Sequence, residues 1–248
     1  MSAEKTEALV IRLADFSESS RVVTLFTRDF GKVSALAKGA KRLKGPFESA
    51  LDLLSRVNVV FLPKSSDSLD LLTEAQLVAR FQPRPRELMS LYGGYYVAEL
   101  LAGLTETHDP HPQLYDAAVE TLQRLGDAPD LRLTILWFET QLLREIGHLP
   151  DFDSCLVCGR PAELREGVRH WVTQGGLVCR ECGRPDLSHT EIHPGTLVIL
   201  QKLADADPER LDRIQASPQQ YKELRRLLTS AVCHVLERRP KMLAYLKF

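Results

Sequence analysis

The chain has 248 residues, of which 44% are hydrophobic and 26% charged, and its formal net charge at pH 7 is −1. This composition is typical of a globular protein with one large domain, or two domains and a small module, and it excludes a disordered or fibrous chain. The start MSAEKTEALV is charged and no apolar run reaches about 18 residues, so neither a signal peptide nor a membrane span is expected, and the protein should be cytoplasmic.

The first 80 residues have the pattern of short strands. Polar or glycine-containing turns such as ADFSESS and RDFG separate five segments with strand composition. These segments are EALVIRL, RVVTLFT, KVSALAK, SRVNVVFL and LDLLTEAQLV. Five short strands in such a stretch predict a small β barrel or sandwich, which leaves one face and its loops available to a ligand.

A change of pattern follows at FQPRPRE, because two prolines interrupt a strand and favour a boundary before a helix. Beyond it, apolar residues recur at helical spacing in RELMSLYGGYYVAELLAGL, QLYDAAVETLQRL, LRLTILWFETQLLREIG, GTLVILQKLA and QQYKELRRLLTSAVCHVLER. These helices need one another for burial. We therefore expect a strand domain at 1–80 and a helical domain made of 81–150 and 185–248, with a compact module inserted at 151–184.

Two Cys-x-x-Cys pairs lie in this insertion, in CLVCG and CRECG. Cys155 and Cys158 form the first pair, Cys179 and Cys182 the second, and twenty residues separate the pairs. Each pair is followed by glycine, which suits a sharp turn that points backbone amides at two thiolates. Four thiolates satisfy tetrahedral zinc, and the intervening segment is long enough for a hairpin that brings the pairs together. The spacing predicts a zinc ribbon, with four unligated cysteines as the alternative.

Four cysteine ligands would close every coordination position, so the zinc is expected to be structural rather than catalytic. Its role would be to fold a segment too short to hold itself together. His170, His189 and His193 are nearby in the sequence, but they are surplus as ligands beside four cysteines. Cys233 falls within the last helical segment, where core packing is the expected role.

A basic stretch, AKGAKRLKG at 37–45, contrasts with the nearly neutral chain. The region from 21 to 44 has a local charge of +6, because Asp29 is its only acidic residue. Its basic residues are Arg21, Arg28, Lys32, Lys38, Lys41, Arg42 and Lys44. The whole-chain isoelectric point of about 6.7 conceals this regional feature.

Two interpretations of the basic stretch compete. It is either a solvated face or a surface that contacts phosphates, with salt-sensitive affinity that does not depend on sequence. Barrel-type single-strand binders combine such a basic groove with aromatic side chains on which bases stack. The nearby aromatic residues either stack on bases in this way or pack in the core, and they are Phe16, Phe26, Phe30 and Phe47. A phosphate loop for ATP is excluded by spacing, because five residues separate Gly39 and Gly45 and Pro46 follows.

The opening EALVIRLADFSESSRVVTLFTRDFGKVSALAKGAKRLKGPFESAL, followed by helical segments that carry CLVCG and CRECG, closely resembles the RecO family of bacterial DNA repair and recombination mediators. The likeness covers essentially the whole chain and is strongest over 7–51 and at the cysteine pairs. It implies an α+β multidomain fold: an N-terminal OB-fold β barrel, then an α-helical domain with an inserted four-cysteine zinc-binding module. RecO-like proteins bind single- and double-stranded DNA, anneal complementary strands and, with RecR, help to load RecA onto single-stranded DNA covered by SSB.

The resemblance also implies site residues. It assigns DNA contacts to the basic residues after the third strand segment, which are Lys38, Lys41, Arg42 and Lys44. Arg21, Arg28 and Lys32 follow more weakly, because alternation along a strand turns some side chains away from a groove. The family docks the SSB C-terminal tail on the helical domain, where the basic clusters are Arg225 with Arg226 and Arg238, Arg239 with Lys241. Ordinary helix-surface charge is the alternative for both clusters.

Enzyme classes fit the motifs poorly. Nucleobase deaminases need H-x-E before P-C-x-x-C, whereas HTE at His189 follows both cysteine pairs. A thioredoxin-like motif occurs once in a βαβ unit, and neither G-x-S-x-G nor H-E-x-x-H is present. The expected protein is therefore a non-enzymatic DNA-binding mediator without a nucleotide cofactor, associated with the nucleoid when bound to DNA. The alternative is an OB-fold and zinc-ribbon factor that binds RNA or acts in transcription.

Overall fold

The structure, a computed structural model, describes residues 2–42, 47, 50–64, 68–161, 168–171, 176–183 and 189–248. Its packing divides the chain into two compact units. The first contains Met1–Asp127 with Met242–Leu246, and the second contains Ala128–Lys241 with Lys247–Phe248. This division differs from the ranges expected from the sequence, because the first two helices pack with the strands.

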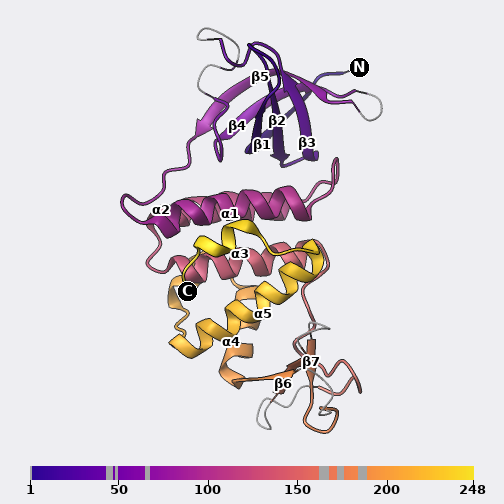
Figure 1. The fold of residues 1–248 in the computed structure, drawn as a ribbon, viewed down its shortest axis with the longest axis vertical. Coiled ribbons are helices and arrows are strands. Elements are labelled where there is room, and N and C mark those ends of the chain that lie inside the picture. Colours follow the sequence, from indigo (N-terminus) through magenta and orange to yellow (C-terminus); the bar gives the residue numbers. More distant parts are fainter. Residues whose placement is uncertain are drawn as a thin grey trace. The chain divides into compact units, whose positions relative to one another are not determined.

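The strands of the first unit close into a barrel with the order β1-β2-β3-β5-β4, as the sequence predicted (Figure 1). Their bounds are β1 Glu4–Asp15, β2 Arg21–Thr27, β3 Gly31–Ala37, β4 Arg56–Leu62 and β5 Asp70–Ala79. β3 and β5 are parallel, and the other neighbours are antiparallel. Closure pairs every strand on both sides and leaves no long exposed edge.

Alternation along the strands builds the barrel core. In β3, the side chains of Val33, Ala35 and Ala37 are fully buried, while the residues between them are partly exposed. Val23 and Leu25 of β2 bury their side chains in the same core. The period of two between inward and outward residues is the feature that made the strands recognisable in the sequence.

Three helical segments complete the first unit: α1 Leu88–Leu104, α2 Pro112–Asp127 and the short 3-10 helix η2 Lys241–Tyr245. α1 packs against β1 and β2, and Ser90 Oγ of α1 donates a 2.6 Å hydrogen bond to the carbonyl of Leu125 in α2. The amide of Met242 donates to the Glu99 carboxylate, which attaches η2 to α1. The sequence pattern did not indicate η2, whose five residues are too few to show a period.

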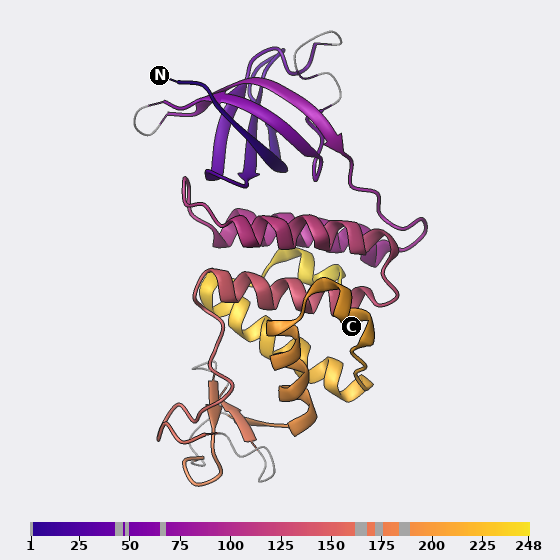
Figure 2. The same cartoon turned by 180° about the vertical axis from the view of Figure 1, so that it is seen from behind.

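The second unit combines helices with a small sheet (Figure 2). Its helices are α3 Leu131–Glu145, α4 Pro194–Asp205, α5 Pro218–Leu236 and the 3-10 helix η1 Pro208–Arg213. The sheet has the order β7-β6-β8, with β6 Val168–Trp171, β7 Gly176–Val178 and β8 His189–Ile192. β6 and β7 are the hairpin expected between the cysteine pairs, and β8 adds residues from beyond the predicted module.

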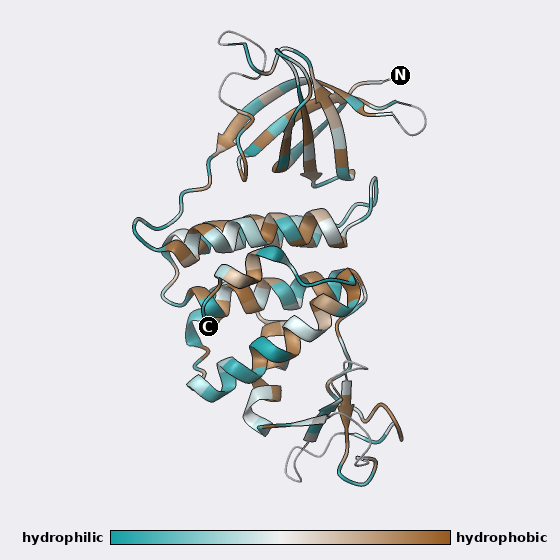
Figure 3. Ribbon diagram, viewed as in Figure 1, coloured by the Kyte–Doolittle hydropathy of each residue, from teal (hydrophilic) through white to brown (hydrophobic). Residues whose placement is uncertain are grey.

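Polar side chains start and join the helices of this unit. Asp130 caps α3 by accepting from the amides of Arg132 and Leu133, and Tyr221 of α5 donates a 2.6 Å hydrogen bond to the same carboxylate. α5 carries both hydrophilic and hydrophobic residues (Figure 3), and its buried face includes Leu224 and Leu228. Among the residues that the structure describes, no helix combines the length and apolar character needed to cross a membrane.

Candidate functional site

The structure separates the predicted DNA-contacting cations into two groups. β2 runs from Arg21 to Thr27 and β3 returns from Gly31 to Ala37, so residues around the turn and residues at the strand ends lie about 20 Å apart. Arg28 and Lys32 belong to the turn. Arg21, Lys38, Lys41 and Arg42 lie at the opposite end, and Lys44 is outside the described residues.

The two cations of the turn bind helices of their own unit. Arg28 makes a two-pronged ion pair with Asp116 of α2, with N–O distances of 3.0 and 2.9 Å. Lys32 Nζ donates to the carbonyl of Ala102 at 2.9 Å and to that of Thr105, and burial lowers the pKa of this lysine. Carbonyls at a helix C-terminus have no partner within the helix, so Lys32 satisfies two such groups of α1. These contacts favour a structural role for both side chains, and their contact with DNA stays a prediction.

The opposite end is called here the cationic end, and it consists of residues 15–21 and 38–42. Lys38 and Arg42 are exposed there. Neither side chain forms a hydrogen bond or ion pair with another residue within the described parts of the chain. Their charges therefore face solvent and are available to an anionic ligand.

Asp15 balances the other two cations of the cationic end. Its carboxylate lies 2.9 Å from Lys41 Nζ and 3.2 Å from Arg21 Nε. The hydrogen bond from Lys41, followed by that from Arg21, holds the pKa of Asp15 below its ordinary value. Lys41 also donates to the carbonyl of Ser17 at 2.9 Å, so this lysine ties the segment after β3 to the β1–β2 loop.

The four phenylalanines near the basic stretch differ in burial. Phe26 and Phe47 are buried in the core, and Phe30 packs edge-on against Phe61 with 5.5 Å between ring centroids. Phe16, which follows Asp15 in the β1–β2 loop, is 62% exposed. The structure thus distinguishes core rings from a surface ring, which the sequence left open.

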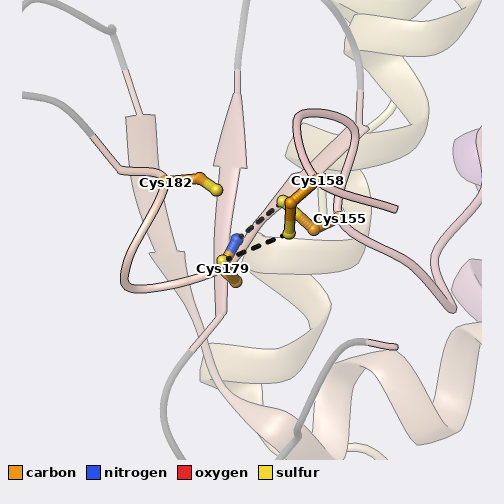
Figure 4. Close-up of side chains that lie close together, drawn as sticks. All are labelled: Cys155, Cys158, Cys179 and Cys182. Atoms are coloured by element: carbon orange, nitrogen blue, oxygen red, sulfur yellow. Dashed lines mark hydrogen bonds between the residues drawn. The ribbon is translucent and has the colours of Figure 1, made fainter. Parts of the chain in front are cut away.

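The four predicted metal ligands come together in the second unit (Figure 4). The Sγ atoms of Cys155, Cys158, Cys179 and Cys182 all lie within 4.8 Å of one another. The Sγ atoms of Cys158 and Cys179 are 3.9 Å apart. Sulfurs arranged tetrahedrally at about 2.3 Å from an ion lie about 3.8 Å apart, so the cluster has the size that a metal ion needs.

Two tight turns present these thiols. The amide of Gly159 donates to the carbonyl of Cys155 at 2.8 Å, and Gly159 has a φ of 68°, a conformation that favours glycine. The amide of Gly183 donates to the carbonyl of Cys179 at 3.0 Å. Cys155 also bridges to Leu177 of β7, which brings the first turn to the hairpin that carries the second. Gly159 has the turn conformation expected for these glycines, whereas Gly183 does not need a positive φ, and the amide of Cys179 donates to Cys155 Sγ at 3.4 Å.

Electrostatics within the cluster favour a cation. Hydrogen bonds from Arg160 lower the pKa of Cys158 to about 6, whereas hydrogen bonding to Cys179 raises the pKa of Cys182 to about 12. Burial alone would raise the pKa of Cys155, but backbone amides led by that of Cys179 outweigh it and lower the pKa. Some thiols thus ionise readily and their neighbours then retain protons, because adjacent thiolates repel one another. A bound cation removes this conflict, so the four residues fit a metal ion.

The remaining histidines and cysteine have other surroundings. His170 is buried in β6, where burial and the charge of Arg226 lower its pKa to about 4. His193 caps α4 by accepting from the amide of Gly195 at 3.0 Å. Neither histidine belongs to the cysteine cluster. The side chain of His189 is outside the described residues. Cys233 is partly buried in α5.

A hollow of about 400 Å³ lies beside α5. It includes Arg225 and Arg226, one of the two basic clusters at which the sequence predicts a peptide site. Its lining consists of Lys222, Arg225, Arg226, Thr229, Ser230 and Phe248. Arg225 pairs with the buried Glu139 at 2.6 and 3.1 Å, and its guanidinium lies 4.6 Å from the ring centroid of Phe248. Lys222 and Arg226 are exposed at the rim, and the second cluster, Arg238 to Lys241, follows α5.

Together, these features define a class: proteins with an OB-like barrel, a helical part and an inserted four-cysteine cluster suited to a metal. Two family models match the chain, "Recombination protein O N terminal" over residues 1–81 and "Recombination protein O C terminal" over residues 85–244. The chain therefore belongs to the RecO family of DNA repair proteins, which confirms the resemblance found in the sequence.

Similar proteins carry the same family name. A DNA repair protein RecO from Rhodopirellula baltica is 38% identical, over 96% of this chain and 97% of its own length. One from Anaeromyxobacter dehalogenans is 33% identical over 96% and 94%, and one from Bacillus pumilus is 28% identical over 90% and 86%. Each alignment covers at least 90% of this chain, so each one includes parts of both units.

Proposed function

We propose that this protein is a non-enzymatic recombination mediator that binds single- and double-stranded DNA and anneals complementary strands. With RecR, it would help to load RecA onto single-stranded DNA covered by SSB, in the cytoplasm and at the nucleoid. The observation that carries the DNA-binding part is the cationic end of the barrel, where Lys38 and Arg42 are exposed without partners among the described residues. Family membership supports the recombination role.

Annealing on such a surface requires positioning rather than bond chemistry. Lys and Arg side chains that contact phosphates release counterions and lower the repulsion between two backbones. Phosphate contacts leave the base edges free to pair. No side chain needs to act as an acid, base or nucleophile in this process.

The experiment for DNA binding measures the anisotropy of a labelled single-stranded oligonucleotide as a function of salt. Changing Lys38, Lys41, Arg42 and Lys44 to Ala is expected to lower affinity and to flatten the slope of log K against log salt by about 0.7 for each lost phosphate contact. Lys5→Ala is a matched control, because Lys5 is exposed at the other end of β1 from Asp15. Equal slopes for the wild type and the fourfold variant would contradict the proposed site.

The competing function is RNA binding or a role in transcription. It is distinguished from the mediator function by the same binding measurement with RNA and by an annealing assay with DNA. A mediator is expected to speed the annealing of complementary DNA strands and to bind single-stranded DNA at least as tightly as RNA. A marked preference for RNA, together with no annealing activity, would favour the alternative.

We further propose that the ion held by Cys155, Cys158, Cys179 and Cys182 is a structural zinc. Zinc accepts four thiolates in a tetrahedron, and four protein ligands leave no position for a reacting water. Purified protein should contain one zinc per cysteine cluster, measured by atomic absorption. Cys158→Ser should lower the zinc content, whereas Cys233→Ser, outside the cluster, should retain it. Full zinc content in the Cys158 variant would contradict this ligand set.

The hollow beside α5 supports a site for the acidic, apolar tail of SSB. The rim cations Lys222 and Arg226 suit the acidic side chains, and the ring of Phe248 gives an apolar wall. Charge reversal by Arg226→Glu should weaken binding of a tail peptide in fluorescence titrations, and Arg239→Glu in the second cluster should not. Arg225 is left unchanged in this test, because it pairs with the buried Glu139.

A further inference from the structure

Phe16 is a large apolar side chain that lies mostly exposed at the cationic end. Its ring is 62% exposed, whereas Phe26 and Phe47 of the same barrel are buried. A single exposed apolar residue is common on protein surfaces and by itself indicates nothing. The position and the support of Phe16 are what distinguish it.

The loop that carries Phe16 is fastened at several points. The amides of Phe16 and Ser17 both donate to the carbonyl of Ser20, at 3.1 and 3.3 Å. From the segment after β3, the amide of Lys41 donates to the carbonyl of Ser19 at 3.1 Å, and Lys41 Nζ donates to that of Ser17 at 2.9 Å. The backbone under the ring is therefore held in place before any ligand binds, which lowers the entropy cost of using the ring as a contact.

The strand register sets Phe16 beside the exposed cations. Asp15 pairs with Arg21, and Arg21 pairs with Ala37, so the three residues form one row across β1, β2 and β3. Phe16 directly follows the end of β1, and Lys38 directly follows the end of β3. Two strand spacings, about 10 Å in all, separate Asp15 from Ala37, so the chain leaves β1 at Phe16 and β3 at Lys38 from points about that far apart. Neighbouring nucleotides of one strand span such a distance, so one can place its base at the ring while another places its phosphate at Lys38.

We propose that Phe16 is a stacking platform for an unpaired base of single-stranded DNA at the cationic end. The inference rests on the DNA-binding function proposed above and adds a basis for telling single strands from duplexes. A base stacks on a ring only when its face is free, and the faces of bases within a duplex are already stacked on their neighbours. The cations attract phosphates of either form, so Phe16 contributes to single-strand binding alone.

The test compares three variants with the wild type on a labelled oligothymidine and on a blunt duplex at one salt concentration. Phe16→Ala should weaken binding to oligothymidine by about fivefold or more, as expected for the loss of one base–aromatic contact, and leave duplex affinity unchanged. Phe16→Tyr, which keeps an aromatic ring, should retain wild-type affinity for both. Tyr245→Ala is the control, because Tyr245 is a 55% exposed aromatic residue on η2 of the same unit.

The outcomes separate this inference from the proposed function. If the wild type binds neither DNA, the proposed function fails. If the wild type binds oligothymidine and Phe16→Ala binds it equally well, or loses single-strand and duplex affinity alike, the stacking platform is wrong while DNA binding stands. Phe16→Trp provides a second measurement, since stacking should quench the added tryptophan fluorescence with oligothymidine beyond any change that wild-type Trp137 and Trp171 show. Absence of this extra quenching at saturating oligothymidine would also overturn the inference.

Discussion

The two ends of the β2–β3 hairpin carry the same pair of residue types in different surroundings. Gly31 and Lys32 begin β3 at the turn, where the loop after α1 and the C-terminus of α1 lie against them. Lys38 and Gly39 follow β3 at the cationic end, where Lys38 faces solvent. A Cβ on Gly31 would lie 2.1 Å from the Asp109 carbonyl oxygen, whereas one on Gly39 would lie 3.5 Å from Arg42 Cδ.

This difference shows how packing assigns a role to a residue type. At the turn, a glycine permits close approach of another backbone, and a lysine satisfies the last carbonyls of a helix. At the cationic end, the same two types form an exposed segment whose charge is available to a ligand. The local sequence is similar at both ends, so the neighbouring elements make the distinction.

The largest effect is expected from the glycine pair. Gly31 and Gly39 both have positive φ, so alanine costs about 1–2 kcal/mol of backbone energy at either position. At Gly31 the clash with Asp109 adds about 1–3 kcal/mol, because the loop must move to admit a methyl group. Urea unfolding should therefore show a larger loss of stability for Gly31→Ala than for Gly39→Ala. Equal losses of stability would mean that the loop at Asp109 moves to admit the methyl group without a measurable loss of unfolding free energy.

The lysine pair should separate stability from DNA affinity. Lys32→Met leaves the carbonyls of Ala102 and Thr105 without their charged donor, and hydrogen bonds of this kind contribute about 1.5–3 kcal/mol. Lys38→Met changes an exposed side chain and should alter unfolding stability by less than about 0.5 kcal/mol. In salt titrations of DNA binding the order reverses, with the slope changed by Lys38→Met and not by Lys32→Met. A flatter salt slope for Lys32→Met would assign this lysine to the DNA surface after all.

Removal of the Asp15 charge should strengthen DNA binding at the cationic end. Asp15→Asn releases Arg21 and Lys41 from their ion pairs and makes both charges available to phosphates. The single-stranded DNA affinity at low salt should rise, and the salt slope should steepen by up to about 1.4, or 0.7 for each added contact. Glu4→Gln is the control, because Glu4 begins β1 at the end remote from Asp15. Unchanged affinity for Asp15→Asn would mean that Arg21 and Lys41 make no phosphate contacts even when they are released.

A smaller effect should appear in the acid dependence of stability. Lys41 and Arg21 lower the pKa of Asp15 below its ordinary 3.8, so the folded state binds this proton less readily than the unfolded state. The stabilisation is therefore fully present above pH 3.8 and is lost as the pH falls through the lowered value. Comparison of unfolding curves from about pH 6 down to about pH 2 should show a shallower acid decline for Asp15→Asn than for the wild type. Identical declines would show that solvent screens these exposed pairs.

Much of the fold could be predicted from local patterns. Each of the five expected strands overlaps a strand of the barrel, and each of the five expected helices overlaps a helix. The patterns did not predict η1 and η2, which are too short to show a period, or the addition of β8 to the sheet of the cysteine module. The packing of α1 and α2 with the barrel unit depends on side chains distant in sequence, such as Tyr115 on Glu7, and local patterns do not show such contacts.

The candidate site was predictable to a different extent in its two parts. The four cysteines of the cluster were identified together, because a tetrahedral thiolate site requires a spacing that is visible in the sequence. The basic residues were identified as one group, yet the structure divides them between two ends of a hairpin. Charge alone does not show which cations already have a protein partner. Arg28, for example, forms an ion pair with Asp116.

By itself, the sequence determined the strand and helix periods, the turn glycines and the cysteine pairs, because each of these depends on residues that are close along the chain. Only the tertiary structure decided that Lys32 serves a helix end while Lys38 faces solvent, and that Phe16 is a surface ring while Phe26 is a core ring. Such outcomes depend on which distant segments pack together. Burial, partner and exposure are properties of that packing, and residues of the same type acquire different roles through it.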